Sequence, residues 1–175
     1  FPKLPKIQKE NVLSFSIPDF LKAARSVLFS VSKSDIRPEI ASIYVSGTPE
    51  GAIKLVATDS FRLAESSFRG NASKSFSFLF PGKRFGEFIR ILESFTGDAR
   101  CFFDEQQFFA THEKFSYFTR LTEGKFPDYE QIIPKSFTTE ATLKRMELAE
   151  NLKLAGIFSG QAREIRLKTY PTDGL

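Results

Sequence analysis

The residue types that most often perform catalysis are sparse in this chain and form no recognisable set. His112 is the single histidine, so a nucleophile that needs an imidazole base would depend on it. It stands beside Glu113 in a predicted hairpin, where an exposed polar residue is ordinary. Cys101 is the single cysteine and lies in a Phe-rich run, as expected for an inert, buried thiol. We therefore predict no catalytic residues and, since no disulfide can form within the chain, a cytoplasmic protein.

Three carboxylates, those of Asp59, Glu123 and Asp128, offer the oxygen ligands that a magnesium ion prefers. Their neighbours Ser60 and Pro127 are turn residues, and no regular spacing relates the three carboxylates to one another. The sequence also contains neither a glycine-rich phosphate loop nor a Cys/His metal-binding spacing. We predict no metal site and no cofactor, and we keep a metal-dependent nuclease or nucleotidyl-transfer domain as the alternative.

Two turn-containing segments combine apolar and polar residues in a way that suits peptide binding. Residues 57–64 read ATDSFRLA, and residues 121–129 read LTEGKFPDY. The Asp-Ser pair in the first favours a turn between strands, and the Pro-Asp pair in the second interrupts an extended chain. An apolar cleft beside Thr58 and Arg62 would accept a short peptide with an aliphatic or aromatic anchor. Its expected lining, for which ordinary strand and turn packing is the alternative, is Ile40, Leu63, Pro127 and Ile132.

The elements that must position these residues follow a pattern that repeats along the chain. Residues 11–17 alternate apolar and polar side chains like a strand, and Pro18 then begins a helix with an apolar stripe. This copy continues with three expected strands, at 40–46, 52–57 and 61–68. The second copy has an expected strand at 76–80, a helix from Pro81, and strands at 99–104, 107–112 and 115–121.

A third copy of the pattern begins near residue 141. Its expected elements are a strand at 141–145, a helix at 146–158 and a strand at 164–169. The helix would direct four apolar residues inward, namely Leu148, Ala149, Leu152 and Ala155. Two complete copies predict an α+β domain in which two helices pack on one face of antiparallel sheets. The helices begin near residues 18, 81 and 146, so the repeat is about 65 residues long. A repeat of this length indicates duplicated halves of a domain, and chance recurrence of ordinary elements is the alternative.

Composition and charge limit the partners without identifying one. The net charge of +4 permits binding to a polyanion but does not require it. Most of the 21 Phe residues alternate inward at strand spacing, which favours core packing. The alternative is a free-standing single-strand nucleic-acid-binding module that stacks bases on exposed Phe. No apolar stretch reaches the length of a membrane span, so we predict no membrane partner.

The two turn-containing segments resemble signature segments in the middle domain of the bacterial DNA sliding clamp, the DNA polymerase III beta subunit. In that family the first segment reads ATDGHRLA, and the second reads GRFPDY followed by a short apolar run and Pro, here Ile132-Ile133-Pro134. Arg37-Pro38 followed by Ile40 is similar to the entry of the family's first strand after the helix. The resemblance covers essentially the whole chain and implies the DNA-clamp fold, built from repeated β-α-β-β-β units.

The resemblance also implies a domain organisation and a function. Residues 1–10 would link the chain to an N-terminal domain, 11–136 would be the clamp middle domain, and 137–175 the truncated start of the C-terminal domain. The implied function is a non-enzymatic processivity factor that encircles double-stranded DNA without sequence specificity. Its partners would be the replicative polymerase, the clamp loader, repair polymerases and mismatch-repair proteins. The full-length protein would be a homodimeric ring, which this chain alone would not close.

The resemblance further implies two sets of site residues. The peptide-binding cleft would be formed by Ile40, Thr58, Ser60, Phe61, Arg62, Leu63, Pro127, Gln131 and Ile132. Three of these depart from the family pattern and would affect peptide preference, because Ser60 replaces Gly, Phe61 replaces His, and Gln131 stands where Arg is often found. The phosphate-facing cations would be Lys22, Arg25, Lys33, Arg37, Lys83, Arg84, Arg90 and Lys153. Asp19 and Glu87 on the same helix faces would reduce the attraction, and for each cation an ordinary solvated helix face is the alternative.

Overall fold

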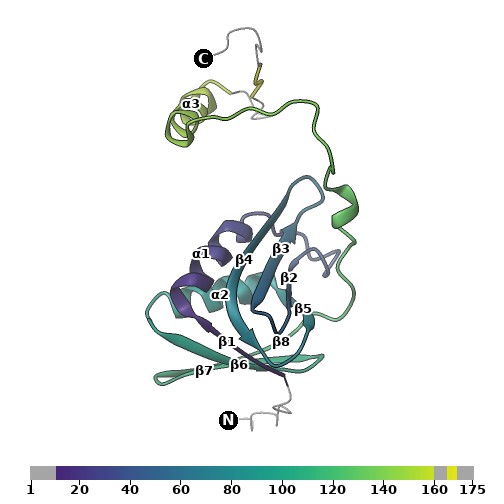
Figure 1. Cartoon of the computed structure of the whole chain (residues 1–175), viewed down its shortest axis with the longest axis vertical. Helices are drawn as coiled ribbons and strands as arrows, with labels where there is room; N and C mark the ends of the chain where they lie inside the picture. The colour runs from purple at the N-terminus through teal and green to yellow at the C-terminus, as the bar shows by residue number, and fades with distance from the viewer. Residues whose placement is uncertain (1–10, 160–164, 169–175) are drawn as a thin grey trace. The chain divides into compact units, whose positions relative to one another are not determined.

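The computed structural model describes residues 11–159 and 165–168 of the chain (Figure 1). The chain divides into two compact units, of which the first ends at Tyr129 and the second begins at Glu130. The expected linker at 1–10 lies outside the described residues. Within the described part, each helix is too short or too polar to cross a lipid bilayer.

The first unit contains both complete copies of the repeat, as predicted. The first copy consists of β1 (Asn11–Ser16), α1 (Ile17–Leu28), β2 (Ser42–Gly47), β3 (Ala52–Thr58) and β4 (Leu63–Ala72). The second consists of β5 (Phe76–Pro81), α2 (Gly82–Leu92), β6 (Asp98–Phe103), β7 (Gln107–His112) and β8 (Phe115–Arg120). Pro18 lies in the first turn of α1 and Pro81 immediately precedes α2, where a missing backbone N–H is tolerated. The strand expected at 61–68 begins two residues later, because residues 59–62 form the turn before it.

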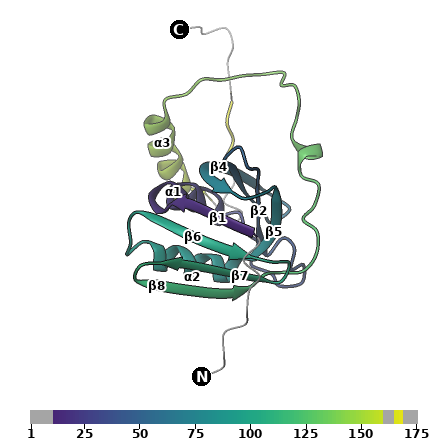
Figure 2. The same cartoon turned by 60° about the horizontal axis from the view of Figure 1, so that its bottom comes forward.

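The two copies form a single eight-stranded sheet by exchanging strands. The strand order is β5-β2-β3-β4-β1-β6-β7-β8, and every adjacent pair is antiparallel. The first strand of each copy pairs with the second strand of the other, so that β1 lies against β6 and β5 against β2 (Figure 2). Leu13 is the register partner of Cys101, and Val45 that of Phe78. Neither copy can therefore complete its sheet without the other.

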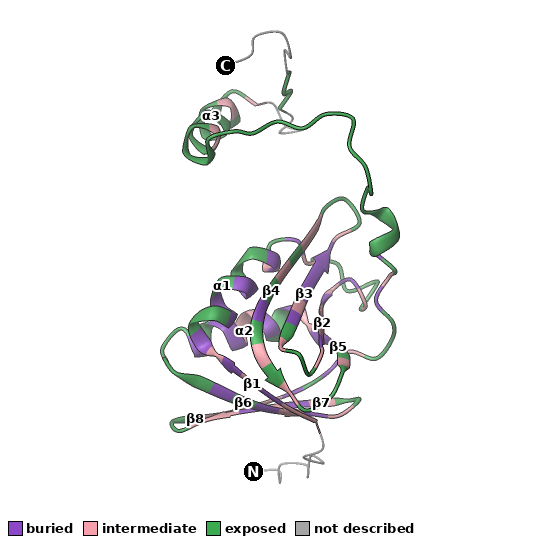
Figure 3. Cartoon of the chain, viewed as in Figure 1, coloured by how far each residue is buried: buried purple, intermediate pink, exposed green. Residues whose placement is uncertain are grey.

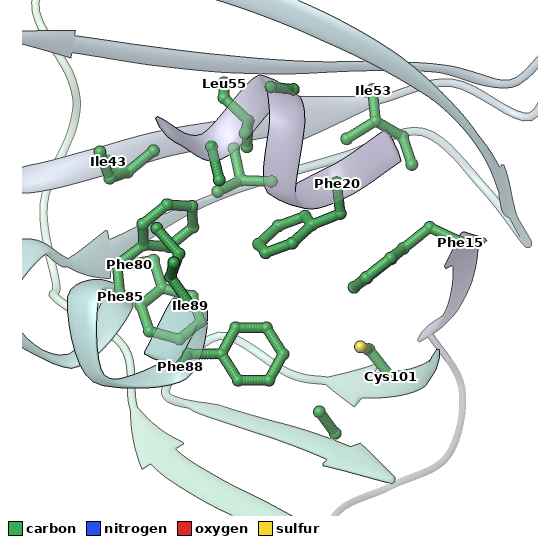
Figure 4. Close-up of a cluster of buried hydrophobic side chains, with 14 of the residues drawn as sticks. Phe15, Phe20, Ile43, Ile53, Leu55, Phe80, Phe85, Phe88, Ile89 and Cys101 are labelled. Carbon is green, nitrogen blue, oxygen red and sulfur yellow. The ribbon is translucent and has the colours of Figure 1, made fainter. Parts of the chain in front are cut away.

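Both helices bury their apolar faces in one core on the same side of the sheet. The ring of Phe20 on α1 lies 5.7 Å from the rings of Phe85 and Phe88 on α2, measured between centroids. Phe80 from the sheet extends this aromatic cluster (Figure 4). Phe108 on β7 adds to it, with its ring centroid 4.9 Å from that of Phe80 and 5.6 Å from that of Phe88. Burying an aromatic or aliphatic side chain of this size contributes about 1.5–3 kcal/mol, so the core is the main source of stability. This packing supports the interpretation of the Phe residues as core rather than as base-stacking platforms.

The second unit differs from its prediction. The helix is confirmed as α3 (Arg145–Ile157), but residues 141–144 form no strand, and neither do residues 165–168. Positions 164 and 169 of the expected second strand lie outside the described residues. α3 has no buried residue, and Figure 3 shows it exposed along most of its length. Of the four residues expected to point inward, Leu148 and Ala155 are half-buried, while Ala149 and Leu152 are exposed. An isolated strand leaves its backbone hydrogen bonds unmade, so the local pattern alone did not produce one.

Candidate functional site

The turn between β3 and β4 is held by hydrogen bonds from its own side chains. The Asp59 carboxylate accepts hydrogen bonds from the backbone N–H groups of Phe61 (3.1 Å) and Arg62 (3.0 Å), and from Nε of Arg62 (3.0 Å). Oγ1 of Thr58 donates to the carbonyl of Arg62 at 2.8 Å and accepts from the N–H of Ser60 at 3.1 Å. Desolvation raises the pKa of Asp59, but these hydrogen bonds together with the charge of Arg62 outweigh it and lower the pKa below its ordinary value.

Ser60 adopts a backbone conformation that favours glycine. Its φ is +75°, in the left-handed region, where a Cβ atom is strained. The clamp family's pattern has Gly at this position, and the turn geometry gives a physical reason for it. The departure at Ser60 therefore preserves the turn at an energetic cost of about 1 kcal/mol.

The same turn presents one aromatic side chain to solvent and contacts another. Phe61 is 98% exposed although its backbone is fixed by Asp59. The guanidinium carbon of Arg62 lies 5.5 Å from the ring centroid of Phe29, the C-cap residue directly after α1. This distance is within the range of a cation–π interaction. Sequence patterns did not predict Phe29 as a neighbour of the turn. The available signal was an apolar residue placed outside the buried stripe of α1.

The second predicted segment crosses the face of the sheet opposite the helices, which we call the outer face. Four buried residues, Val56, Leu79, Phe126 and Tyr129, form an apolar cluster there with half-buried Tyr44 and Leu63, and we call this set the outer-face cluster. The ring of Phe126 stacks on Tyr44 with centroids 5.3 Å apart. The Tyr129 hydroxyl donates a 2.6 Å hydrogen bond to Glu65. The N–H of Thr122 donates to the carbonyl of Leu79 at 2.9 Å, which fixes the start of the segment.

The two predicted segments thus meet in one region of the outer face. Leu63, from the first segment, belongs to the outer-face cluster and is the register partner of Thr58. Pro127 is half-buried between the two anchors Phe126 and Tyr129. The sequence predicts only that Pro127 and Asp128 interrupt the extended chain, and it does not predict the burial of Phe126 and Tyr129. The signal for this burial was a pair of aromatic residues three positions apart. A second signal was the presence of apolar residues at positions of β2, β3 and β5 that face away from the helices.

The predicted cleft also includes Ile40, Gln131 and Ile132. Ile40 is buried in the loop before β2, where its N–H donates to the carbonyl of Arg37 at 3.2 Å. Gln131 and Ile132 belong to the second unit, in the short 3-10 helix Glu130–Ile132, and both are exposed. The peptide cleft as a whole stays a prediction.

The predicted phosphate-facing cations of the first unit are all exposed, and several are paired. Lys22 and Arg25 lie on α1, while Lys83, Arg84 and Arg90 lie on α2. Arg25, Lys83 and Arg84 each contact a carboxylate within 3.0 Å, and so does Arg37 in the loop after α1. The hydrogen bond and the charge of Glu87 raise the pKa of Arg84. Lys33 lies in that same loop, and Lys153 lies on α3 of the second unit.

The residues considered for catalysis do not assemble. Nε2 of His112 lies 3.1 Å from the carbonyl oxygen of Thr96, and the rings of Phe95 and Phe115 flank it. Cys101 is fully buried, and desolvation raises the pKa of its thiol. Over the ranges that the structure describes, no three His, Cys, Asp or Glu side chains gather closely enough to hold a metal ion. Asp59, one of the three carboxylates considered for magnesium, is engaged in the turn.

Comparison with known proteins gives a consistent result. Residues 16–128 match the family model of the DNA polymerase III beta subunit, central domain. A beta sliding clamp of Streptococcus pneumoniae is 25% identical over 100% of the chain, which covers 47% of that relative. One of Chlamydia pneumoniae is 31% identical over 93% of the chain and 44% of the relative. The chain therefore spans about half the length of the curated relatives it matches.

Solved structures show the same similarity. The crystal structure of the DNA polymerase sliding clamp from Bacillus subtilis matches with a TM-score of 0.85 at 24% identity, over 92% of the chain and 43% of that protein, and this is a likeness of fold. The DNA polymerase III beta chain of Streptococcus pneumoniae matches with a TM-score of 0.81 at 26% identity, over 93% of the chain and 44% of that protein. The α+β fold with paired helices is thus the fold of these clamps.

Proposed function

The chain belongs to the family of the DNA polymerase III beta subunit, the beta sliding clamp, and from this membership we propose that it forms the middle domain and the beginning of the last domain of a processivity factor. The complete protein would encircle double-stranded DNA without reading its sequence and would hold the replicative polymerase on it. It would act in the cytoplasm as a homodimeric ring and as an accessory subunit without catalysis of its own.

The observation that carries this proposal is the pair of helices on one side of the sheet. Because their apolar faces are buried in the shared core, their polar faces point away from the sheet. We call the two polar faces together the helix face. It presents five cations to solvent, namely Lys22, Arg25, Lys83, Arg84 and Arg90. Cations that contact only phosphate groups bind DNA independently of its sequence, and the contacts weaken as salt increases. Weak and exchangeable contacts of this kind suit a ring that slides.

We assign the docking of partner proteins to the β3–β4 turn and the adjoining outer-face cluster. Hydrogen bonds from its own side chains fix the turn, and a preformed turn lowers the entropic cost of binding. Its exposed Phe61 and half-exposed Leu63 offer apolar anchors beside the Arg62 guanidinium. Short peptides of the replicative polymerase, the clamp loader, repair polymerases and mismatch-repair proteins would bind there.

Binding to DNA tests the assignment of the helix face. We expect the chain to bind a fluorescein-labelled duplex oligonucleotide weakly at low ionic strength, and single-stranded DNA of the same length more weakly still. Lys22→Gln and Arg90→Gln would each weaken duplex binding about two- to five-fold, as for the loss of one phosphate contact. Lys125→Gln is the matched control, because Lys125 is exposed beside Phe126, which is buried on the outer face opposite the helices. Equal effects of all three substitutions, or tighter binding to single strands, would contradict the assignment.

Retention on DNA tests the ring itself. Residues 11–129 would replace the matching segment of the Bacillus subtilis clamp, whose fold they share. We expect the chimera, once loaded by the Bacillus subtilis clamp loader, to stay on a circular plasmid and to leave it after a single double-strand cut. If a chimera of the parent clamp's size in solution dissociated equally fast from both forms of the plasmid, the chain would not support a sliding ring.

A further inference from the structure

Several cations of the helix face form ion pairs with nearby carboxylates. Arg25 on α1 contacts Glu93, the C-cap residue directly after α2, at 2.7 Å. Lys83 at the start of α2 contacts Asp35 in the loop after α1, at 2.8 Å. Two of the ion pairs therefore join parts of the chain that are far apart in sequence, across the junction of the two helices.

A third pair lies within α2, where Arg84 contacts Glu87 one turn later at 2.9 Å. By contrast, no ion pair is recorded for Lys22 and Arg90 among residues 11–159 and 165–168. The helix face thus contains two kinds of cation. Arg25, Lys83 and Arg84 are paired with a carboxylate, whereas no such pair is recorded for Lys22 and Arg90 in the described ranges. The carboxylates of Glu93, Asp35 and Glu87 face solvent beside the same cations that would meet DNA.

We propose that Glu93, Asp35 and Glu87 act as a set of competitors that limit how strongly the helix face holds duplex DNA. This inference rests on the proposed function, because it requires the helix face to be the DNA-binding surface. A phosphate can contact Arg25, Lys83 or Arg84 only by displacing or sharing the carboxylate. The side chains of the three pairs are between 41% and 78% exposed, so that exchange needs no rearrangement of the core.

The consequence is a DNA contact that is weaker than the number of cations indicates. Every phosphate that displaces a carboxylate leaves an unpaired negative charge next to the DNA backbone, which repels it. Lys22 and Arg90 would then supply most of the steady contact, and the paired cations would contact DNA only briefly. A ring that must move along DNA gains from this arrangement, since it remains attracted to the duplex without being fixed to one phosphate register.

Removal of one carboxylate is the direct test. We expect Glu93→Gln to tighten binding of the 175-residue chain to a labelled duplex oligonucleotide about two- to five-fold at low ionic strength. The plot of log binding constant against log salt concentration should become steeper by roughly 0.9, the value for one additional phosphate contact. Asp35→Asn is an independent variant in a loop, so its effect does not depend on the stability of α2. Thermal unfolding followed by circular dichroism would verify that each variant is folded.

Two controls separate local competition from a general change in charge. Glu123→Gln removes an equal charge from the exposed segment that leads to the outer-face cluster. Compared at an ionic strength of about 0.1 M, where the Debye length is about 10 Å and distant surface charges are screened, it should change the affinity by less than about 1.5-fold. The double variant Arg25→Gln/Glu93→Gln removes the released cation as well, so it should bind no more tightly than the parent chain. Equal tightening by Glu93→Gln and Glu123→Gln, or a gain that persists in the double variant, would overturn the inference.

The outcomes also distinguish this inference from the proposed function. If Lys22→Gln and Arg90→Gln weaken duplex binding but the carboxylate variants leave it unchanged, the helix face binds DNA and only the competition is wrong. If none of these substitutions differs from its control on the segment of the outer face, the helix face is not the DNA-binding surface, and both conclusions are wrong.

Discussion

The two units of the chain begin with the same kind of sequence pattern but reach different structures. In the first unit, each copy of the repeat lends its first strand to the other, and α1 and α2 are buried against the joint sheet. In the second unit, α3 forms from a comparable pattern, yet none of its residues is buried and the described residues beside it form no strand. A helix can form from local interactions, whereas strands and a core require partners. The difference shows that the stable unit of this fold is the pair of copies.

The largest expected effect contrasts the two units directly. Phe88→Ala removes a buried ring that contacts four other aromatic rings, and we expect it to lower the free energy of unfolding by about 3–5 kcal/mol. Leu152→Ala on α3, where Leu152 is 37% exposed, should change it by less than about 0.5 kcal/mol. Urea unfolding followed by far-UV circular dichroism measures both. Phe88→Leu, with about 1–2 kcal/mol expected, serves if the alanine variant does not fold. Similar losses at Phe88 and Leu152 would show that the second unit also has a core.

Sequence patterns predicted the order of elements in the first unit because that order depends on local periodicity. The alternation at Phe76, Phe78 and Phe80 and the positions of Pro18 and Pro81 were sufficient to locate two strand–helix junctions. The exchange of β1 and β5 between copies was not predictable in this way, since strand pairing is a long-range choice that periodicity does not encode. The prediction of a strand at 141–145 was wrong for the same reason, because periodicity does not show whether a partner strand is available.

The candidate site shows a similar division. The exposure of Lys22, Arg25 and Arg90 followed from helical periodicity and could be predicted. Their carboxylate partners could not, because Arg25 and Glu93 are 68 residues apart in sequence. The burial of Phe126 and Tyr129 was also missed, since a segment with turn residues normally lies on the surface.

The next effect tests how closely the helices and the loops of the first unit are packed. A Cβ atom added at Gly82 would lie 2.5 Å from a methyl carbon of Val31 and 2.8 Å from the carbonyl oxygen of Ala41. We therefore expect Gly82→Ala to destabilise the protein by about 1–3 kcal/mol. Gly86→Ala in the same helix meets no atom within 4 Å and should stabilise it by about 0.5–1 kcal/mol through helix propensity. Urea midpoints that shift in the same direction for both variants would contradict the close approach at Gly82.

A smaller effect concerns the long-range contact that fixes the segment on the outer face. Tyr129→Phe keeps the ring in the outer-face cluster but removes the hydroxyl that donates to Glu65 at 2.6 Å. We expect a loss of about 1–2 kcal/mol, since the hydrogen bond is charge-assisted and half-buried. Tyr44→Phe is the matched control in the same cluster, because no hydrogen bond is recorded for the Tyr44 hydroxyl within the described ranges, and it should change stability by less than about 0.5 kcal/mol. If thermal unfolding shows equal losses, ring packing rather than the hydrogen bond holds the segment.

The smallest effect lies in the β3–β4 turn, where only local interactions are at stake. Ser60 has a φ of +75°, so Ser60→Gly relieves the strain on Cβ, although glycine also gains freedom in the unfolded chain. The strain relief is the larger of the two, because a left-handed conformation costs an L-residue about 1–2 kcal/mol. We expect a net stabilisation of about 0.5–1 kcal/mol in urea unfolding. Ser60→Ala keeps the Cβ atom and should be neutral, so stabilisation by alanine as well would assign the effect to the hydroxyl instead of the backbone. Because Thr58 and Asp59 hold the turn with or without the strain, the glycine variant should leave the fold of the first unit unchanged, and only the local contribution to its stability should rise.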